Sequence, residues 1–328
     1  MSNRSSAAGA AFRTASSSSQ SRSALPARGL AAALGAFAIW GLFPIYLKGL
    51  AHISAMQITA HRIAWSCVFV LAWMALRGEL GALRAAIARD GVFARLAASA
   101  LLISINWLAF AWAVNNDHVL DVSLGYYVGP LLNVLLGIVV LKERLNGAQW
   151  TAVAVASAGV LYLIVVGGHV PWTAFTVGAS FGVYGLIRKT VRIDALPGLA
   201  VETILLAPFA VGYLIWCHAH GAGALGNSSI GVDALLVGSG VVTAVPLFLF
   251  AFGARQIPYS TMGVIQFVGP SLQLACGLIV FGEAFDSARA VGFVLIWIAL
   301  LIYSGHGLWQ ARARKPALEL SEVTARGR

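Results

Sequence analysis

Charged residues are scarce in this chain. They make up 10% of its 328 residues, whereas soluble proteins carry about 25%. Hydrophobic residues make up 59%. The two values exclude an ordinary soluble domain and predict an all-α integral membrane protein.

Cysteine is almost absent. The three cysteines, Cys67, Cys217 and Cys276, all lie in apolar runs. Their number is odd, and their spacing matches no metal-binding pattern. This excludes a disulfide framework, and we expect neither a metal nor another cofactor.

Acidic residues are few, and the basic residues are unevenly placed. The chain has 22 Lys and Arg against 12 Asp and Glu, for a net charge of +10. With the N-terminus on the cytoplasmic side, 19 of the 22 fall in cytoplasmic segments, because only Lys48 and Arg289 lie outside and Arg62 lies within the membrane. Lys and Arg accumulate in cytoplasmic loops. This topology thus accounts for the excess of basic over acidic residues and argues against a nucleic-acid partner. It also places both termini in the cytoplasm.

Ten apolar runs are candidates for spanning helices, which take about 20 residues each. They are residues 30–48, 56–76, 95–114, 119–141, 148–166, 172–187, 196–216, 233–254, 259–281 and 288–306. A Ser- and Arg-rich segment at residues 1–28 precedes them, and residues 307–328 follow. We expect both to be cytoplasmic tails; the first also has the composition of an organellar transit peptide.

The chain repeats itself at a shift of 140 residues. Seven of the eighteen positions from Tyr126 to Glu143 are identical after this shift. The repeat divides the chain into two halves, residues 29–168 and 169–306, with five predicted helices each. Because five is odd, the second half must run opposite to the first in the membrane. Ten helices in two inverted five-helix repeats is the build of many secondary transporters.

The repeat includes a Gly-Pro pair in the middle of an apolar run. Gly129-Pro130 corresponds to Gly269-Pro270. Proline lacks an N–H and breaks or kinks a helix. Interrupted helices at matching positions of two halves point to a transporter's binding site. The alternative is that both prolines only bend helices for packing.

Ionisable residues inside the predicted helices are candidate functional groups, because they are costly in a membrane. His61 and Arg62 lie in one half, and Glu202 lies in the corresponding helix of the other half. We expect Arg62 to anchor an anionic group of a substrate, and Glu202 or His61 to carry a proton. The alternative is that they brace neighbouring helices or that Arg62 extends to the membrane surface.

Amides and aromatic residues accompany these groups. We expect them to orient the substrate or line its cavity, although hydrogen bonding between helices and ordinary packing are the alternatives. The residues are Asn106, Asn133, Gln266, Gln273, Trp107 and Tyr126. Asn133 and Gln273 correspond in the repeat, three residues after their prolines.

Two glutamates also correspond in the repeat, Glu143 and Glu283. They are candidates for a gate or for coupling between the halves. Alternatively, they are charges placed ahead of the next helix.

Several segments in order resemble the RarD branch of the EamA family, within the drug/metabolite transporter superfamily. They are AIWGL (38–42), HRIAWS (61–66), NWLAF (106–110), WAVNN (112–116), SLGYY (123–127), YGLIRK (184–189) and ET (202–203). The resemblance implies ten helices in two EamA repeats, a permease of the bacterial inner membrane and an association with chloramphenicol sensitivity.

The function we predict is secondary-active transport of a small metabolite or drug-like solute by alternating access. The expected partners are the solute and the lipid bilayer, and a homodimer is left open. A membrane-embedded enzyme would need a nucleophile with a base, or a metal cluster, at membrane depth, and the sequence offers neither. A membrane partner or sensor subunit that moves no solute is the remaining alternative.

Overall fold

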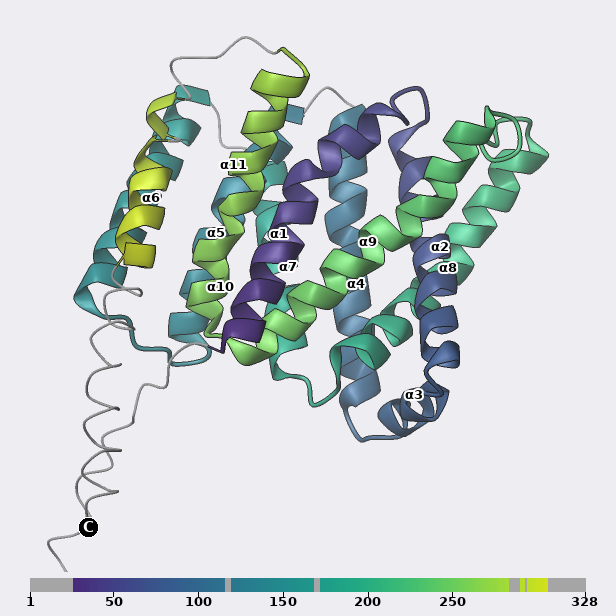
Figure 1. Ribbon diagram of the computed structural model, residues 1–328, viewed down its shortest axis with the longest axis horizontal. Coiled ribbons are helices and arrows are strands. Elements are labelled where there is room, and N and C mark those ends of the chain that lie inside the picture. The colour runs from purple at the N-terminus through teal and green to yellow at the C-terminus, as the bar shows by residue number, and fades with distance from the viewer. Residues whose placement is uncertain (1–25, 116–118, 168–171, 283–289, 293, 306–328) are drawn as a thin grey trace, which may run out of the picture.

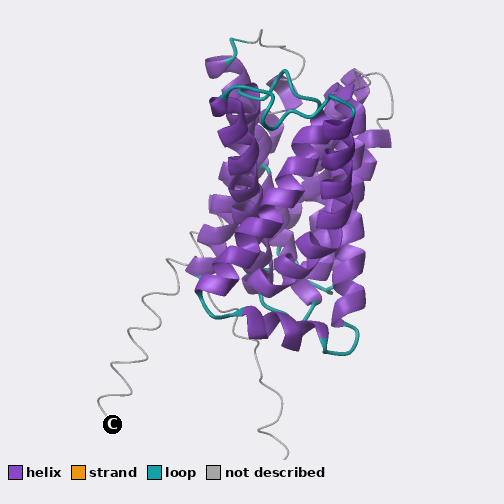
Figure 2. Ribbon diagram, turned by 90° about the vertical axis from the view of Figure 1, so that its right-hand side faces the viewer, coloured by secondary structure: helices purple, strands orange, loops and turns teal. Residues whose placement is uncertain are grey.

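The computed structural model describes residues 26–115, 119–167, 172–282, 290–292 and 294–305. Within these ranges every regular element is a helix, and the helices form one bundle (Figure 1, Figure 2). The elements are α1 (Ala27–Lys48), α2 (Ala55–Leu76), α3 (Leu80–Ile87), α4 (Val92–Asn115), α5 (Val119–Val139), α6 (Gly147–Gly167), α7 (Trp172–Thr190), α8 (Ala195–Ala219), α9 (Ile230–Gln256), α10 (Tyr259–Gln266), α11 (Val268–Ala275) and a π-helical turn, η1 (Cys276–Val280).

Seven helical stretches of the described chain are long and apolar enough to cross a membrane. They are Ala27–Lys48, Ala55–Leu76, Val92–Phe110, Gly147–Val166, Ala195–Ala219, Ile230–Gln256 and Tyr259–Val280, and two shorter apolar helices are Gly125–Val139 and Ala290–Gly305. Large apolar side chains face outward, among them Phe209 (79% exposed) and Ile279 (83%). Such a surface is a liability in water but is the normal exterior in lipid. The protein is therefore an all-helical integral membrane protein, and the count of ten spans stays a prediction.

The basic connection after α2 contains the short helix α3. Gly78 and Gly91 flank it with φ of 67° and 70°, a left-handed conformation that glycine adopts readily and that ends helices. We call the end of the bundle at which α3 lies and α1 begins the α3 end; it is at the bottom of Figure 1.

The two Gly-Pro segments differ in the structure. The predicted run 259–281 is divided at Phe267, so that Pro270 lies in the first turn of α11, where a missing N–H leaves no hydrogen bond broken. In the other half, α5 continues through Pro130. There Gly178 of α7 permits a close approach to α5: a Cβ on Gly178 would lie 3.2 Å from the Gly129 nitrogen.

Most helix contacts occur in matching pairs. α5 packs on α7 as α11 packs on α1, α1 packs on α9 as α7 packs on α4, and α2 packs on α9 as α8 packs on α4. α2 also contacts α8, and α5 contacts α10. The counterparts in the two halves are α1 and α7, α2 and α8, α4 and α9, and α5 and α10–α11. Replacing each helix by its counterpart turns one contact of a pair into the other.

An aromatic layer crosses the middle of the bundle. The Phe250 ring lies 5.0 Å from that of Phe181, 6.0 Å from those of Phe37 and Trp40, and 6.1 Å from that of Tyr184. These rings come from α1, α7 and α9. The layer separates two groups of polar side chains, one on each side.

Candidate functional site

A cavity of about 120 Å³ lies on the side of the aromatic layer away from the α3 end. It is enclosed by residues of α1, α2, α4, α5, α7, α9, α10 and α11. Eight residues that the sequence singles out line it: Arg62, Asn106, Trp107, Tyr126, Gln266, Gly269, Pro270 and Gln273. They come from both halves of the chain.

Among the described residues that line this cavity, Arg62 is the only charged one. Its guanidinium lies between two rings, 4.8 Å from the centre of Phe43 and 5.3 Å from that of Trp107. Arg62 Nε donates to Thr243 Oγ1 (2.9 Å). Among the described residues no carboxylate lies within ion-pair distance of Arg62. The stacked guanidinium thus brings a positive charge to the cavity, in a form suited to a carboxylate or phosphate.

The amides around the cavity are hydrogen-bonded across helices. Asn106 Nδ2 donates to Val177 O (2.7 Å), which ties α4 to α7, and Gln273 Nε2 donates to Trp40 O (3.3 Å), which ties α11 to α1. Asn133 is fully buried behind the cavity wall, and its Nδ2 donates to Gln266 Oε1 (2.5 Å). Asn133 therefore orients an amide that lines the cavity and does not itself line it.

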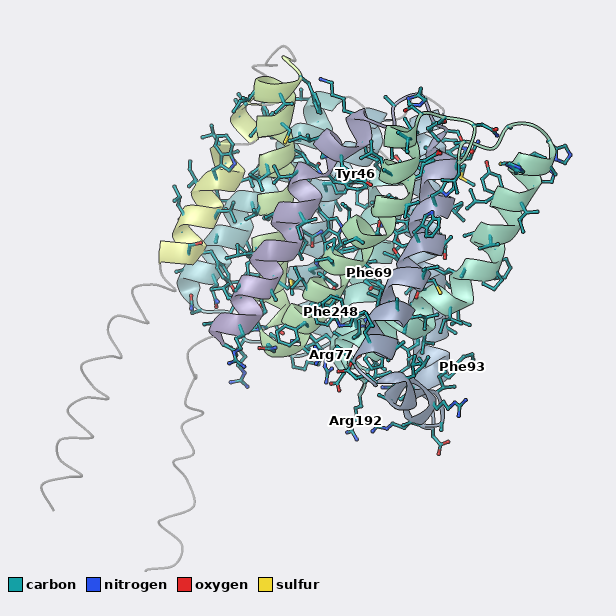
Figure 3. The ribbon with its side chains drawn as sticks, turned by 45° about the vertical axis from the view of Figure 1, so that its right-hand side comes forward. Tyr46, Phe69, Arg77, Phe93, Arg192 and Phe248 are labelled. Carbon is teal, nitrogen blue, oxygen red and sulfur yellow. The ribbon has the colours of Figure 1, made fainter. Side chains whose placement is uncertain are left out.

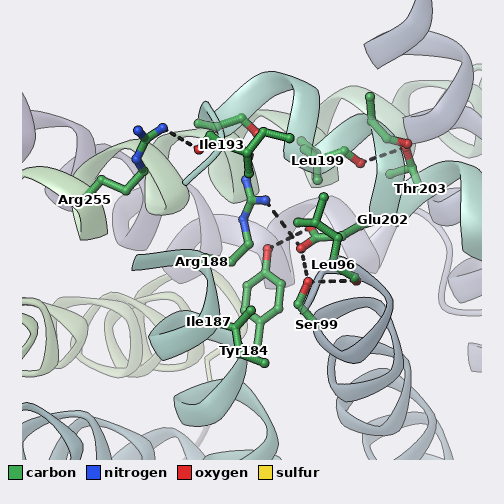
Figure 4. Close-up of polar contacts among 12 residues, drawn as sticks. Leu96, Ser99, Tyr184, Ile187, Arg188, Ile193, Leu199, Glu202, Thr203 and Arg255 are labelled. Atoms are coloured by element: carbon green, nitrogen blue, oxygen red, sulfur yellow. Dashed lines mark hydrogen bonds and ion pairs between the residues drawn. The ribbon is translucent and has the colours of Figure 1, made fainter. Parts of the chain in front are cut away.

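Glu202 lies on the other side of the aromatic layer and does not line the cavity. It accepts hydrogen bonds from Ser99 Oγ and, at 3.4 Å, from Tyr184 Oη, while Arg188 Nη1 lies 3.6 Å from Glu202 Oε1 (Figure 4). The side chains of Arg188 and Glu202 are 1% and 3% exposed. Arg62 and Glu202 correspond in the repeat, yet one faces a cavity and the other lies in a closed ionic cluster.

Arg188 completes this cluster and was counted from the sequence only as a cytoplasmic basic residue. A signal was available, since Tyr184 and Arg188 are four residues apart and so share one face of α7. Gly198 makes the room: a Cβ there would lie 2.0 Å from Arg188 Nη1. Arg188 Nη2 donates to Ala195 O (2.8 Å), and its Nε and Nη1 have no hydrogen-bond partner within the described residues.

The remaining candidates lie away from the cavity. His61 is 3% exposed, does not line the cavity, and its Nδ1 has no hydrogen-bond partner within the described part of the chain. Glu143 accepts hydrogen bonds from Tyr259 N (2.6 Å), Ser260 N (2.9 Å) and Ser260 Oγ (2.6 Å), so it caps the start of α10. Glu283 lies outside the described residues. Across the described ranges no three His, Cys, Asp or Glu side chains gather as metal ligands.

Comparison with known proteins gives a consistent result. Residues 27–165 match the EamA-like transporter family. An uncharacterized transporter of Vibrio cholerae is 42% identical over 88% of this chain and 96% of its own. Protein RarD of Escherichia coli is 36% identical over 87% of this chain and 96% of its own.

One crystal structure of a protein superposes with a TM-score of 0.65, over 84% of this chain and 96% of its own, at 18% identity, and so shows a shared fold alone. The relatives are similar over nearly their whole lengths, and the apolar helices of this chain are those of a membrane protein. The chain therefore belongs to the EamA-like transporter family, in its RarD-type branch.

Proposed function

We propose that this protein is a secondary-active transporter of a small organic anion and works by alternating access between two inverted five-helix repeats. The observation that carries the proposal is Arg62. A buried or half-buried cation in a membrane is expensive unless it is paired, and no described carboxylate pairs with this one. A solute with a carboxylate or phosphate group supplies the missing charge.

The shape of the cavity restricts the rest of the solute. Phe37, Trp40, Trp107 and Phe181 line it, with Asn106, Gln266 and Gln273 as the amide side chains. Aromatic walls favour a planar or apolar body, and the amides are placed to orient a few polar atoms on it. The transported solute is thus amphipathic, with the anionic group at Arg62.

Two observations support the inverted repeat. Most helix–helix contacts have an equivalent contact between the counterpart helices of the other half. A similar glycine–leucine contact also occurs in each half: a Cβ on Gly41 would lie 2.6 Å from Leu272 Cβ, and one on Gly182, one position off the shift of 140, would lie 3.8 Å from Leu132 Cβ. Leu132 and Leu272 correspond at the shift of 140 residues, which relates the α1–α11 contact to the α5–α7 contact.

The α3 end has the contacts of a closed gate. The Arg188–Glu202 cluster joins α7 to α8, and Lys189 Nζ donates to Ala254 O (2.9 Å) and Ile257 O (2.6 Å) at the end of α9. Arg77 and Arg192 extend from this end (Figure 3), which supports a cytoplasmic α3 end with cytoplasmic termini. The conformation is then outward-facing.

Transport requires the α3 end to open. Opening would separate Glu202 from Arg188 and admit water, and Glu202 is the carboxylate placed to take up a proton in that step. His61 is the second titratable group proposed for the proton path, although it does not line the cavity. Glu143, which holds the start of α10 against the end of α5, is the hinge contact of the same movement.

The proposal is tested by solute profiling of cells and medium. A deletion strain is complemented with wild type, Arg62→Ala, Arg62→Lys or Arg84→Ala, with matched membrane abundance. Arg84 is an exposed residue of α3 and serves as the control for loss of a positive charge. We expect one organic anion to be redistributed by wild type and Arg84→Ala, and transport to fall about ten- to hundredfold in Arg62→Ala, as for loss of hydrogen bonds to a charged group.

Arg62→Lys separates charge from geometry. Lysine keeps the positive charge but lacks the planar fork that stacks between two rings, so we expect intermediate transport. If no solute distinguishes wild type from the deletion strain, the protein is not a transporter under these conditions, and a partner or sensor subunit becomes the better account. If Arg62→Ala moves a solute as fast as wild type does, the protein is a transporter but Arg62 is not its anion-binding residue.

A further inference from the structure

A second and larger hollow lies at the α3 end, on the outside of the bundle. Its volume is about 730 Å³, against about 120 Å³ for the central cavity. It is lined by the last turns of α2, the first turns of α8 and the last turns of α9. A compact solute that fits the central cavity would leave most of this groove empty.

The walls of the groove are aromatic. Phe69 and Trp73 of α2 have ring centres 5.8 Å apart, and Phe248 and Phe252 of α9 have ring centres 6.1 Å apart. Trp73 is 47% exposed. Two aromatic walls of this kind suit an extended hydrocarbon chain and offer a water-soluble solute few polar contacts.

The rim of the groove carries two ion pairs. Arg77 Nε lies 2.7 Å from Glu79 Oε1, and Arg255 Nη1 lies 2.9 Å from Asp194 Oδ1. The Arg77 and Asp194 side chains are 60% and 85% exposed. Phe69, Phe248 and Arg77 follow one another toward the α3 end in Figure 3. The aromatic walls thus lie at the depth of hydrocarbon, and the rim lies where α2 and α9 end, at the level of lipid headgroups.

We infer that this groove binds a phospholipid whose headgroup carries both a phosphate and a primary ammonium, namely phosphatidylethanolamine. The rim has two guanidinium groups and two carboxylates and is neutral overall. The phosphate of the lipid contacts Arg77 or Arg255, and its ammonium donates to Glu79 or Asp194. A purely anionic headgroup would leave both carboxylates facing negative charge, and a choline headgroup has no N–H to donate.

Exchange of partners at this rim is inexpensive. Exposed ion pairs contribute little because water competes for both groups, so the lipid headgroup can replace one partner of each pair. Buried pairs such as Arg188–Glu202 do not offer this freedom. The acyl chain lies along Trp73 and Phe248, and holds α2 against α9 at the α3 end.

The test is lipid retention measured by native mass spectrometry. The protein is reconstituted into nanodiscs with equal amounts of phosphatidylethanolamine, phosphatidylglycerol and phosphatidylcholine, and the retained lipids are counted after release. We expect wild type to retain phosphatidylethanolamine about five- to tenfold over phosphatidylglycerol, as two exposed charge contacts would give. Glu79→Gln combined with Asp194→Asn should reverse the preference toward phosphatidylglycerol, because it leaves Arg77 and Arg255 without acidic neighbours.

The groove itself is tested with a matched pair of tryptophan variants. Trp73→Ala removes a wall of the groove, whereas Trp216→Ala removes a tryptophan of similar exposure (56% against 47%) on α8 away from it. We expect lipid loss in the first and wild-type retention in the second. Equal lipid retention in both variants would show that the groove is not the lipid-binding site. If wild type retains phosphatidylglycerol or phosphatidylcholine as well as phosphatidylethanolamine, the headgroup assignment is wrong.

Discussion

Breaking the Arg188–Glu202 pair should strongly destabilise the protein. Glu202→Gln keeps the size of the side chain but removes the negative charge beside Arg188, which is 1% exposed. Removing one partner of a buried pair costs about 3–5 kcal/mol, because the other charge is left buried. The Arg188 Nη1–Glu202 Oε1 distance of 3.6 Å is longer than a hydrogen bond, so we expect the lower end, about 3 kcal/mol.

The loss should be recovered when both charges are removed. Replacing a buried pair by apolar residues of similar volume is often neutral or stabilising, so Arg188→Met combined with Glu202→Leu should be far more stable than the sum of the single changes implies. Tyr184 and Ser99 lose an acceptor in this variant, which limits the recovery. Arg77→Met, which breaks the exposed pair with Glu79, is the control and should change stability by less than about 1 kcal/mol.

The measurement is reversible unfolding in one detergent or bilayer mimic, followed by helix content. Wild type, Arg188→Met, Glu202→Leu and the double variant form a double-mutant cycle, and Glu202→Gln and Arg77→Met are measured beside them. A coupling of about 2–3 kcal/mol between positions 188 and 202 is expected. The reasoning is refuted if Glu202→Gln is no less stable than Arg77→Met, or if the effects at the two positions simply add.

Two further predictions concern the same end of the bundle. Gly198→Ala would place a Cβ 2.0 Å from Arg188 Nη1 and should destabilise the protein as the loss of the ion pair does, whereas Gly212→Ala in the same helix has nothing within 4 Å and should be neutral or slightly stabilising; thermal unfolding of both compares them. Glu143→Gln weakens the cap on α10, where the two carboxylate oxygens accept from the Tyr259 and Ser260 backbone amides and from Ser260 Oγ, and should cost about 1.5–3 kcal/mol. Unchanged amide hydrogen exchange at 259–262 in this variant would show that the cap does not hold α10.

The helices were predictable because a membrane span depends on a run of consecutive apolar residues in the sequence. The run 148–166 became α6 (Gly147–Gly167), and the run 56–76 became α2 (Ala55–Leu76). The hydrocarbon core requires about 20 apolar residues and forces the backbone into a helix whatever its neighbours are. The division at Phe267 was not predictable in detail, because both Gly-Pro segments carry the same signal and only one of them is divided.

The cavity residues were predicted in part. Arg62, Asn106, Trp107, Tyr126, Gln266 and Gln273 converge on one cavity, because each is a polar or aromatic residue that the bundle interior can accommodate only beside a space or a partner. Asn133 and Glu202 are also polar residues of the bundle interior, but each is satisfied by other side chains of the protein and does not line the cavity. From sequence alone a partner on another helix and a partner in a solute look the same.

The sequence by itself determined that this is a helical membrane protein of the EamA-like transporter family, with an internal repeat of its Gly-Pro segment. These properties follow from composition, run length and the order of residues, and none depends on which helices touch. The tertiary structure alone decided that the equivalent positions of the repeat, Arg62 and Glu202, lie on opposite sides of an aromatic layer, and that Arg188 neutralises one of them. The physical reason is that the role of a charged side chain in the membrane interior depends on the groups that lie next to it. Those groups come from helices far apart in the chain.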